Sequence, residues 1–217
     1  MTKTYNQIAG RSLDRIAALS DGVFAIAMTL IVLEIRVPKL PHATSDAALW
    51  GALLTLVPRF VTYGLSFLTL GIFWNGQQTQ LLYLERADRH LTWIHLAFLA
   101  AVALMPFSTS LLAEYIGLRL ALLVYWLNLF PLGVILYFSW VYARRAGFVR
   151  HDVSSEVDGA VKRRIVAYQI AYAVATAACL VIPPVGSIPP TYWSIGLIVL
   201  TQLNSALAPR IPFISRF

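Results

Sequence analysis

The sequence predicts an all-α integral membrane protein that crosses the bilayer with six helices. The chain has 217 residues, of which 59% are hydrophobic and only 12% are charged, whereas about a quarter of the residues in a soluble domain are charged. Six apolar runs are each long enough for a crossing, which takes about 20 helical residues. They lie near residues 16–37, 50–76, 91–113, 117–142, 164–183 and 190–208. Since no internal repeat or soluble domain is evident, residues 1–217 are expected to form one membrane domain.

The first run carries ionisable residues close to its start. Pro38 closes this run, and counting back about 20 residues places Asp21, and near it Arg15, at or inside the near membrane boundary. Ionisable groups at that depth are costly and usually functional. Ser20 and Asp21 are equally suited to a plain helix start, because both residue types are favoured N-caps, so both interpretations stay open. Arg15 and Asp21 are six residues apart and face different sides of a helix, so we expect their partners on other helices.

Prolines modify the runs that follow. The second run is too long for a single crossing, and Pro58 and Arg59 are expected to mark its outer boundary, with residues 47–57 helical outside the bilayer. Pro106 and Pro131 interrupt the third and fourth runs, and prolines in membrane helices kink more often than they break. The polar segment 144–163 is expected simply to link the fourth and fifth helices.

The basic residues predict the orientation of the chain. Short loops with an excess of Lys and Arg stay in the cytoplasm. With the N-terminus inside, only Arg36, Lys39, Arg59 and Arg119 fall outside, so both termini are expected to be cytoplasmic. The residues on the inner side are then Lys3, Arg11, Arg15, Arg86, Arg89, Arg144, Arg145, Arg150, Lys162, Arg163, Arg164, Arg210 and Arg216. The net charge of +7 therefore reflects topology, and no nucleic-acid partner is expected.

Catalytic and metal-binding motifs are absent from the sequence. The four histidines are scattered, and no His-x-x-x-His, Gly-rich phosphate loop or Gly-x-Ser-x-Gly elbow occurs. A single cysteine, Cys179, excludes an intrachain disulfide and a cysteine-based metal cluster. We therefore expect no enzyme activity, no catalytic residue and no metal or other cofactor.

An ion pathway of the carbonyl-filter type is also absent, since the chain lacks Thr-Val-Gly-Tyr-Gly. Any ion would have to pass along helix faces. The first run offers such a face, on which Val23, Ile26, Leu30, Leu33 and Val37 recur at helical spacing, with Thr29 beside Ile26 and Leu33. Its other residues are equally apolar, so periodicity cannot select one stripe. A packing seam between helices remains the alternative.

The first-run sequence Arg-x-x-x-Leu-Ser-Asp-Gly-Val-Phe-Ala-Ile-Ala-x-Thr-Leu-x-Val-Leu-Glu, residues 15–34, resembles a motif of a known family. The family is that of the bacterial relatives of transmembrane protein 175, the endosomal and lysosomal potassium channel. The resemblance continues through the first half of the chain. It rests there on Tyr63-Gly-Leu-Ser-Phe67, Phe73-Trp74, Arg86-x-Asp88, Leu91-x-Trp93 and Pro106-Phe-Ser-Thr109, with Tyr125 and Asn128 as weaker support.

The resemblance implies a six-helix subunit, with four subunits around a central pore lined by the first helices. The narrowest point would be an apolar ring at Ile26, with Leu30 and Leu33 further out and Thr29 as a polar ring. The polar residues that tie helices together near the cytoplasmic end would be Arg15, Ser20, Asp21, Trp74 and His95.

Several positions depart from the family pattern. Leu19 replaces a usual phenylalanine, Gln77 and Gln78 replace a common histidine pair, and His95 stands where an asparagine is often found. Glutamine cannot titrate, so a pH response through those two positions is in doubt. Histidine titrates near neutral pH, and His95 is a candidate replacement sensor.

Together these features predict a homotetrameric, potassium-permeable cation channel of the bacterial inner membrane, in which the apolar ring is both gate and selectivity element. Its partners would be its own copies, the lipid bilayer and monovalent cations. Glu34 is a candidate for concentrating cations at the outer mouth, and a surface pair with Arg36 or Lys39 is its alternative role. The alternative function is a secondary transporter or exporter of a small ion or solute, which would need discontinuous helices or paired repeats around midplane charges.

Overall fold

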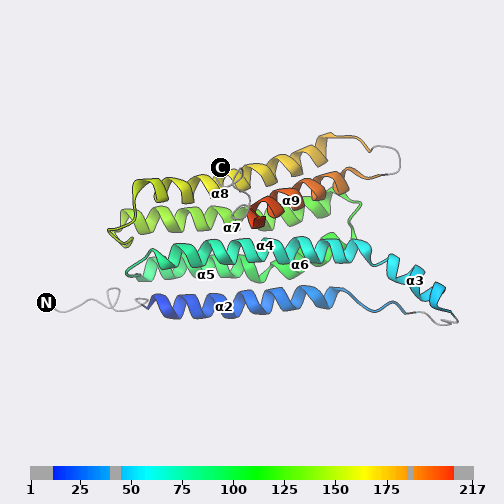
Figure 1. The fold of residues 1–217 in the computed structure, drawn as a ribbon, viewed down its shortest axis with the longest axis horizontal. Coiled ribbons are helices and arrows are strands. Elements are labelled where there is room, and N and C mark those ends of the chain that lie inside the picture. The colour runs from blue at the N-terminus through cyan, green and yellow to red at the C-terminus, as the bar shows by residue number, and fades with distance from the viewer. Residues whose placement is uncertain (1–11, 40–44, 185–187, 208–217) are drawn as a thin grey trace.

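The computed structural model describes residues 12–39, 45–184 and 188–207, which form a bundle of long helices lying along one axis (Figure 1). The elements in chain order are α2 (Leu13–Leu30), the 3-10 helix η1 (Ile31–Glu34), α3 (Asp46–Leu54), α4 (Val57–Leu82), α5 (Arg89–Ala103), α6 (Met105–Glu114), α7 (Arg119–Arg145), α8 (Ser155–Val181) and α9 (Pro190–Leu207). One isolated bridge joins Leu84 and Val149, and none of the described residues belongs to an extended strand. The all-α prediction is confirmed.

Length and composition identify four spans in the described residues that suit a membrane crossing: Leu13–Glu34, Arg89–Glu114, Arg119–Arg145 and Ser155–Val181. A fifth appears if the bent pair α3 and α4 is counted as one span. The protein therefore crosses the membrane several times. The sixth predicted run corresponds to α9, which is helical but is not among these spans.

The second run divides as the prolines indicate. α3 and α4 meet at an angle of 46°, and Pro58 lies in the first turn of α4, where a missing N–H does no harm. No residue of α3 is buried. Pro106 likewise lies in the first turn of α6, which begins at Met105, two residues after α5 ends at Ala103, while Pro131 lies inside an unbroken α7.

The segment 144–163 does more than link two helices, so that expectation was wrong. Its first two residues end α7 and its last nine belong to α8. The loop between these helices pairs with the loop that precedes α5. Glu85 N donates to Phe148 O and Arg150 N donates to Tyr83 O, each at 2.9 Å. These bonds fasten the two loops together at the same end of the bundle.

A belt of buried polar side chains crosses the apolar core. Tyr125 of α7 lies 3.2 Å from Ser66 and from Thr69 of α4, measured between hydroxyl oxygens. Thr109 of α6 donates to Ser66 at 2.8 Å, and Gln202 of α9 donates to Thr69. Polar side chains inside a membrane bundle are stabilised by such interhelical bonds. The belt therefore joins four helices that are far apart in the sequence.

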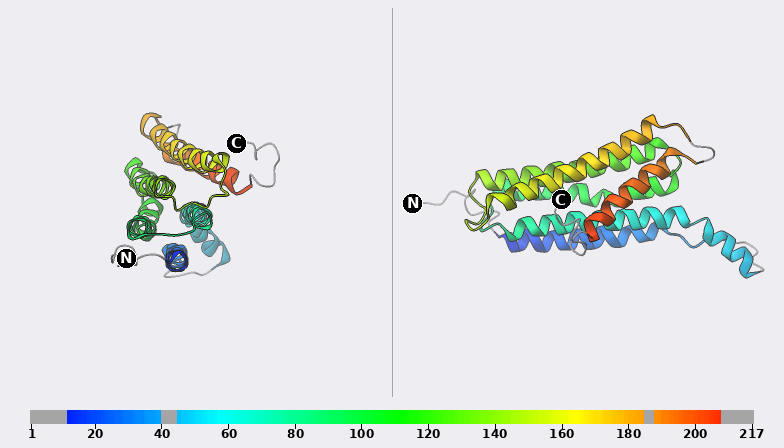
Figure 2. Two further views of the ribbon diagram at one scale, coloured as in Figure 1. Left: turned by 90° about the vertical axis from the view of Figure 1, so that its left-hand side faces the viewer. Right: turned by 45° about the horizontal axis from the view of Figure 1, so that its top comes forward.

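The helix α2 lies at one edge of the bundle (Figure 2, left). It packs against α4 and α5, while η1 reaches α6. Phe24 of α2 contacts Phe98 of α5 with ring centroids 6.0 Å apart, and Phe73 of α4 closes the same aromatic group. One side of α2 is thus fixed by the bundle, and its other side has no covering element among the described residues.

Candidate functional site

Burial separates two apolar stripes on α2 that the sequence could not distinguish. On the side facing the bundle, Phe24 and Ala27 are 1% and 2% exposed. On the opposite side, Ile26, Leu30 and Leu33 are 61%, 43% and 65% exposed. The three residues that were expected to form the ring therefore lie together on the uncovered stripe, one helical turn apart.

Thr29 lies on the same uncovered stripe and is exposed. Its hydroxyl donates to the Ile26 carbonyl at 2.9 Å, within its own helix. Because the hydroxyl proton is used in this bond, the oxygen lone pairs remain available on the surface. A ring of such oxygens would be a polar element in an otherwise apolar stripe.

Asp21 joins α2 to α4 near the beginning of the stripe. Trp74 donates its indole N–H to Asp21 Oδ1 at 2.7 Å, and Gln78 Nε2 donates to the same oxygen at 2.8 Å. The expectation that Asp21 meets partners on another helix agrees with these bonds. Sequence reasoning did not assign Gln78 to this network, although it noted the Gln77-Gln78 departure. The two glutamines are adjacent, so they point to different sides of α4.

The other expected members of the network lie elsewhere. Ser20 is buried, but its hydroxyl donates to the Ile16 carbonyl of its own helix at 2.8 Å, and it has no hydrogen bond to another helix among the described residues. Arg15 is exposed, and its side chain has no hydrogen bond or ion pair with a described residue. These two residues do not tie helices together within one copy of the chain.

His95 forms a second network in the core, separate from Asp21. Its Nδ1 lies 3.0 Å from Gln77 Nε2 of α4, and its Nε2 lies 3.3 Å from the Ser139 hydroxyl of α7. The side chain is 2% exposed. His95 thus joins three helices, α4, α5 and α7, through neutral partners.

Glu34, at the far end of the stripe, turns toward the bundle. Its carboxylate accepts a hydrogen bond from Ser110 of α6 at 2.8 Å. Its backbone carbonyl accepts one at 3.0 Å from Arg59 of α4, and the same arginine forms an ion pair with Glu114 at 2.6 Å. In the described residues Glu34 has no ion pair with Arg36 or Lys39, so the surface pair considered from the sequence is not formed.

Comparison with known proteins gives consistent matches. Residues 15–106 match the family model described as "Endosomal/lysosomal potassium channel TMEM175". A potassium channel of Streptomyces collinus is 38% identical over 137 residues, covering 61% of this chain and 65% of the relative. The human endosomal/lysosomal proton channel TMEM175 is 33% identical over 100 residues, covering 44% of this chain and 20% of the relative. These alignments therefore span less than two thirds of the relatives' own lengths.

A solved structure extends the match over almost the whole chain. A crystal structure of a lysosomal potassium-selective channel TMEM175 homologue from Chamaesiphon minutus superposes with a TM-score of 0.74 and 26% identity, covering 92% of this chain and 98% of that one. In the second half of the chain, where the family's sequence motifs become sparse, the similarity is thus one of fold.

Proposed function

We propose that the chain is a member of the TMEM175 family and that it forms a potassium-permeable cation channel in the bacterial inner membrane. The pore in this proposal lies between copies of the chain, along the uncovered stripe of α2. No carbonyl filter is involved. A secondary transporter, which would need a substrate site around midplane charges, is the alternative that the flux test below separates from a channel.

The observation that carries this proposal is the two-sided burial of α2. Phe24 and Ala27 fasten the helix to its own bundle, while Ile26, Leu30 and Leu33 face outward at the edge. A helix held on one side and uncovered on the other is suited to line a cavity shared between copies. Four copies around an axis would bring four α2 stripes together, and closed symmetric rings are the usual arrangement for identical subunits.

In such a ring the apolar side chains are both gate and constriction. A narrow apolar ring excludes water and raises the energy of an ion, whereas a wider one stays wet and conducts. Selectivity would then come from stripping water at Ile26, helped by the Thr29 hydroxyls. Since the ring cannot replace a whole hydration shell with oxygens, it should favour potassium over sodium only modestly. Glu34 adds negative charge at the far end of the stripe, although Ser110 holds its carboxylate toward the bundle.

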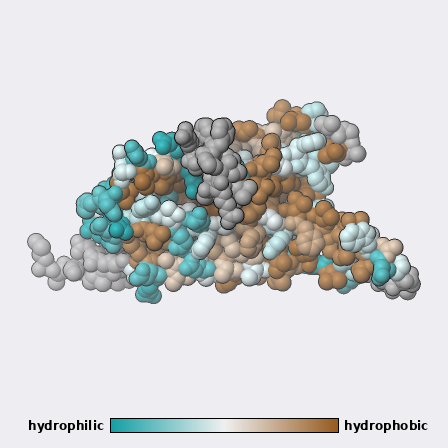
Figure 3. All heavy atoms as spheres, viewed as in Figure 1, coloured by the Kyte–Doolittle hydropathy of each residue, from teal (hydrophilic) through white to brown (hydrophobic). Residues whose placement is uncertain are grey.

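The distribution of charge supports the orientation with both termini in the cytoplasm. Hydrophilic residues gather at one end of the molecule and apolar residues cover the middle (Figure 3). The hydrophilic end holds the start of α2, the α4–α5 loop and the α7–α8 loop, and therefore the basic residues Arg86, Arg89, Arg144, Arg145 and Arg150. An excess of positive charge marks the cytoplasmic side.

The test is passive cation flux from liposomes that contain the purified protein. Under a potassium gradient without other energy input, wild type should release potassium faster than sodium, and Ile26→Asn should change the rate or the preference. Val174→Asn is the matched control, because Val174 is 60% exposed on α8, away from α2. A pH gradient in parallel vesicles measures proton flux separately.

The outcomes separate the competing functions. Flux that Ile26→Asn alters and Val174→Asn does not would support a pore with its neck at Ile26. Flux that both variants leave unchanged would show that the narrowest part of the pore does not lie on α2. Flux that appears only when a second ion or proton is supplied in exchange would favour the transporter.

A further inference from the structure

A shallow groove runs between α7 and α8, on a side of the bundle that α2 does not reach. It has a volume of about 290 Å³, and all of its exposed surface is apolar. Phe130, Val134 and Phe138 line it from α7, and Val166 and Ile170 line it from α8. From Ile165 to Ala173 the groove follows α8 for about 12 Å at 1.5 Å per residue. This length is most of the depth of one leaflet, since the hydrocarbon core is about 30 Å thick.

A glycine of α7 lies at the base of the groove. Gly133 is buried in α7 beneath the Gln169 side chain, which crosses from α8 and lies 3.5 Å from the Leu129 carbonyl. A Cβ atom at position 133 would overlap the Gln169 side chain. The glycine therefore lets α8 approach α7 closely here, with the larger apolar residues standing on either side as walls.

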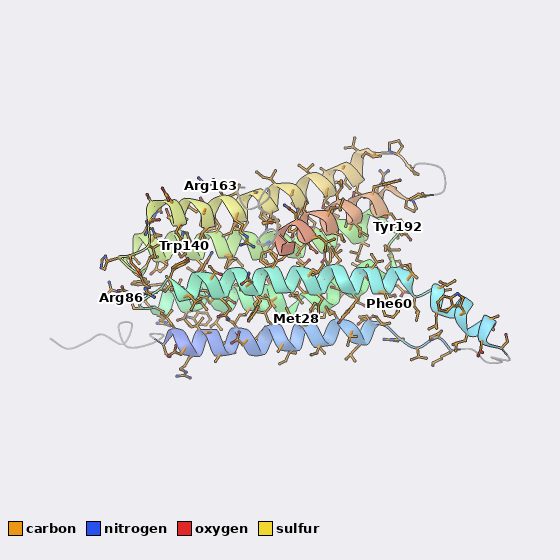
Figure 4. All side chains as sticks on the ribbon, in the orientation of Figure 1. Met28, Phe60, Arg86, Trp140, Arg163 and Tyr192 are labelled. Atoms are coloured by element: carbon orange, nitrogen blue, oxygen red, sulfur yellow. The ribbon has the colours of Figure 1, made fainter. Side chains whose placement is uncertain are left out.

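Basic residues continue the two walls toward the hydrophilic end of the bundle. Arg163 precedes Val166 by three residues on α8, and Arg145 follows Phe138 by seven on α7, so each lies one or two turns beyond the groove on the same helix. Both arginines are exposed, and neither has an ion pair or hydrogen bond with a described residue. Figure 4 shows Arg163 on the outer side of α8.

The neighbouring cations Arg144 and Lys162 differ from these two arginines because each forms an ion pair. Arg144 and Lys162 both reach Asp158, at 3.4 Å and 2.9 Å, and Trp140 donates to the same carboxylate at 2.7 Å. The group of four cations and one carboxylate keeps a net charge of +3. The next acid on α8, Glu156, is seven residues from Arg163, about 10 Å along the helix.

We propose that this groove binds an anionic phospholipid, with one acyl chain between α7 and α8 and the phosphate held by Arg163 and Arg145. The groove supplies apolar surface at the depth of the chain, and the arginines supply charge at the depth of the headgroup. Guanidinium groups are suited to phosphate, which they bind through two parallel hydrogen bonds. Basic pockets between membrane helices bind anionic headgroups for the same reason. The proposal depends on the membrane location of the chain and is independent of ion conduction.

The test is lipid retention by the purified full-length protein in native mass spectrometry. The probes are dioleoyl phosphatidylglycerol, dioleoyl phosphatidylcholine and glycerol phosphate. Wild type should retain phosphatidylglycerol in preference to phosphatidylcholine, and glycerol phosphate should not compete. Arg163→Gln and Arg145→Gln should each reduce the preference about fivefold, which corresponds to about 1 kcal/mol per basic residue near an anionic surface.

Two further variants separate the groove from general surface charge. Arg150→Gln removes an exposed positive charge at the same end, where Arg150 pairs with Asp152 at 3.4 Å, and should leave the preference unchanged. Ala173→Phe places a larger side chain in the groove and should reduce retention of both lipids, with circular dichroism reporting its helical content. Equal retention of the two lipids by wild type would overturn the proposal. So would competition by glycerol phosphate, or a loss in Arg150→Gln as large as in Arg163→Gln.

Discussion

The hydroxyl group of Tyr125 joins helices that are distant in the chain. Its oxygen lies 3.2 Å from Ser66 and from Thr69, both of which are fully buried in α4. Ser66 donates to this hydroxyl while accepting a bond from Thr109 of α6. Removing the phenolic oxygen would leave a buried donor without an acceptor, and such a donor costs about 1–3 kcal/mol.

Tyr125→Phe is therefore expected to lower the free energy of unfolding by about 1–3 kcal/mol, measured by thermal unfolding in detergent. Tyr137→Phe is the control on the same helix, because the Tyr137 hydroxyl has no hydrogen bond with a described residue. An equal loss of stability in the two variants would show that the polar belt does not stabilise the fold.

The role proposed for Thr29 is tested by changing its hydroxyl alone. Thr29→Val keeps the shape and removes the oxygen, so the preference for potassium over sodium should fall by about twofold to fivefold, equivalent to about 1 kcal/mol or less. Thr29→Ser retains the hydroxyl and should keep the preference. Flux ratios in liposomes measure both. A preference that is unchanged in Thr29→Val would leave selectivity entirely to the apolar residues.

Single residues also show where sequence reasoning stopped. Ile26 and Phe24 are both large and apolar, and nothing in their neighbourhood distinguishes them. Phe24 is buried because Phe98, 74 positions later in the chain, packs against it, and that contact cannot be read from local periodicity. His95 and Gln77 are 18 residues apart and lie on different helices, so local sequence did not predict their bond.

At the scale of the elements, α2 is joined to α4 by one carboxylate. Asp21→Ala removes the acceptor for Trp74 and Gln78, and both donors lie partly at the surface, so we expect a loss of about 1 kcal/mol. Thermal unfolding and size-exclusion chromatography should show reduced stability or assembly, with the ion preference of the remaining channels unchanged. Asp46→Ala, at the start of the outlying α3, is the matched control. An intact assembly with altered selectivity would contradict this structural role.

The beginning of α4 was predicted best, because Pro58 decides it and a proline in a first turn loses no hydrogen bond. At Pro106 a kink was expected, whereas α5 ends at Ala103 and a separate helix, α6, begins at Met105 with Pro106 in its first turn. The segment 144–163 was predicted less well. Its polarity suggested a simple connection, but α8 begins at Ser155 with a serine N-cap at Ser154. The loop within this segment pairs with the loop before α5 through backbone hydrogen bonds. Because backbone groups do not depend on residue type, the sequence did not predict this pairing.

At the scale of the whole molecule, the number of crossings decides whether the two termini lie on the same side of the membrane. Four or five spans are evident from length and composition, and a sixth crossing requires α9 to pass through the bilayer. Hydropathy identified α9 as an apolar run, but its polar residues, among them the fully buried Gln202, lower its apolar character. The Gln202 side chain donates a hydrogen bond to Thr69 inside the bundle. A hydropathy scale scores the residue as polar and cannot detect this bond.

Reporter fusions test this point. If α9 crosses, reporters placed before Met1 and after Phe217 should both be active on the cytoplasmic side, since an even number of crossings returns the chain to its starting side. A fusion in the segment 40–44, after the first span, is the control and should report the outer side. A C-terminal reporter active outside would show that the chain crosses an odd number of times.

The bond between Gln202 and Thr69 has a consequence for how the protein is made. A ribosome delivers the chain from its N-terminus, so α4, α6 and α7 enter the membrane while α9 is still being synthesised. Thr69 can bond Tyr125 at that stage, but its bond with Gln202, 133 residues later in the chain, forms only after α9 has been made. Ser66, Thr109 and Tyr125 can already bond one another. Biogenesis thus has a final step, the arrival of α9, and a nascent chain that stops before it should remain a substrate for membrane quality control.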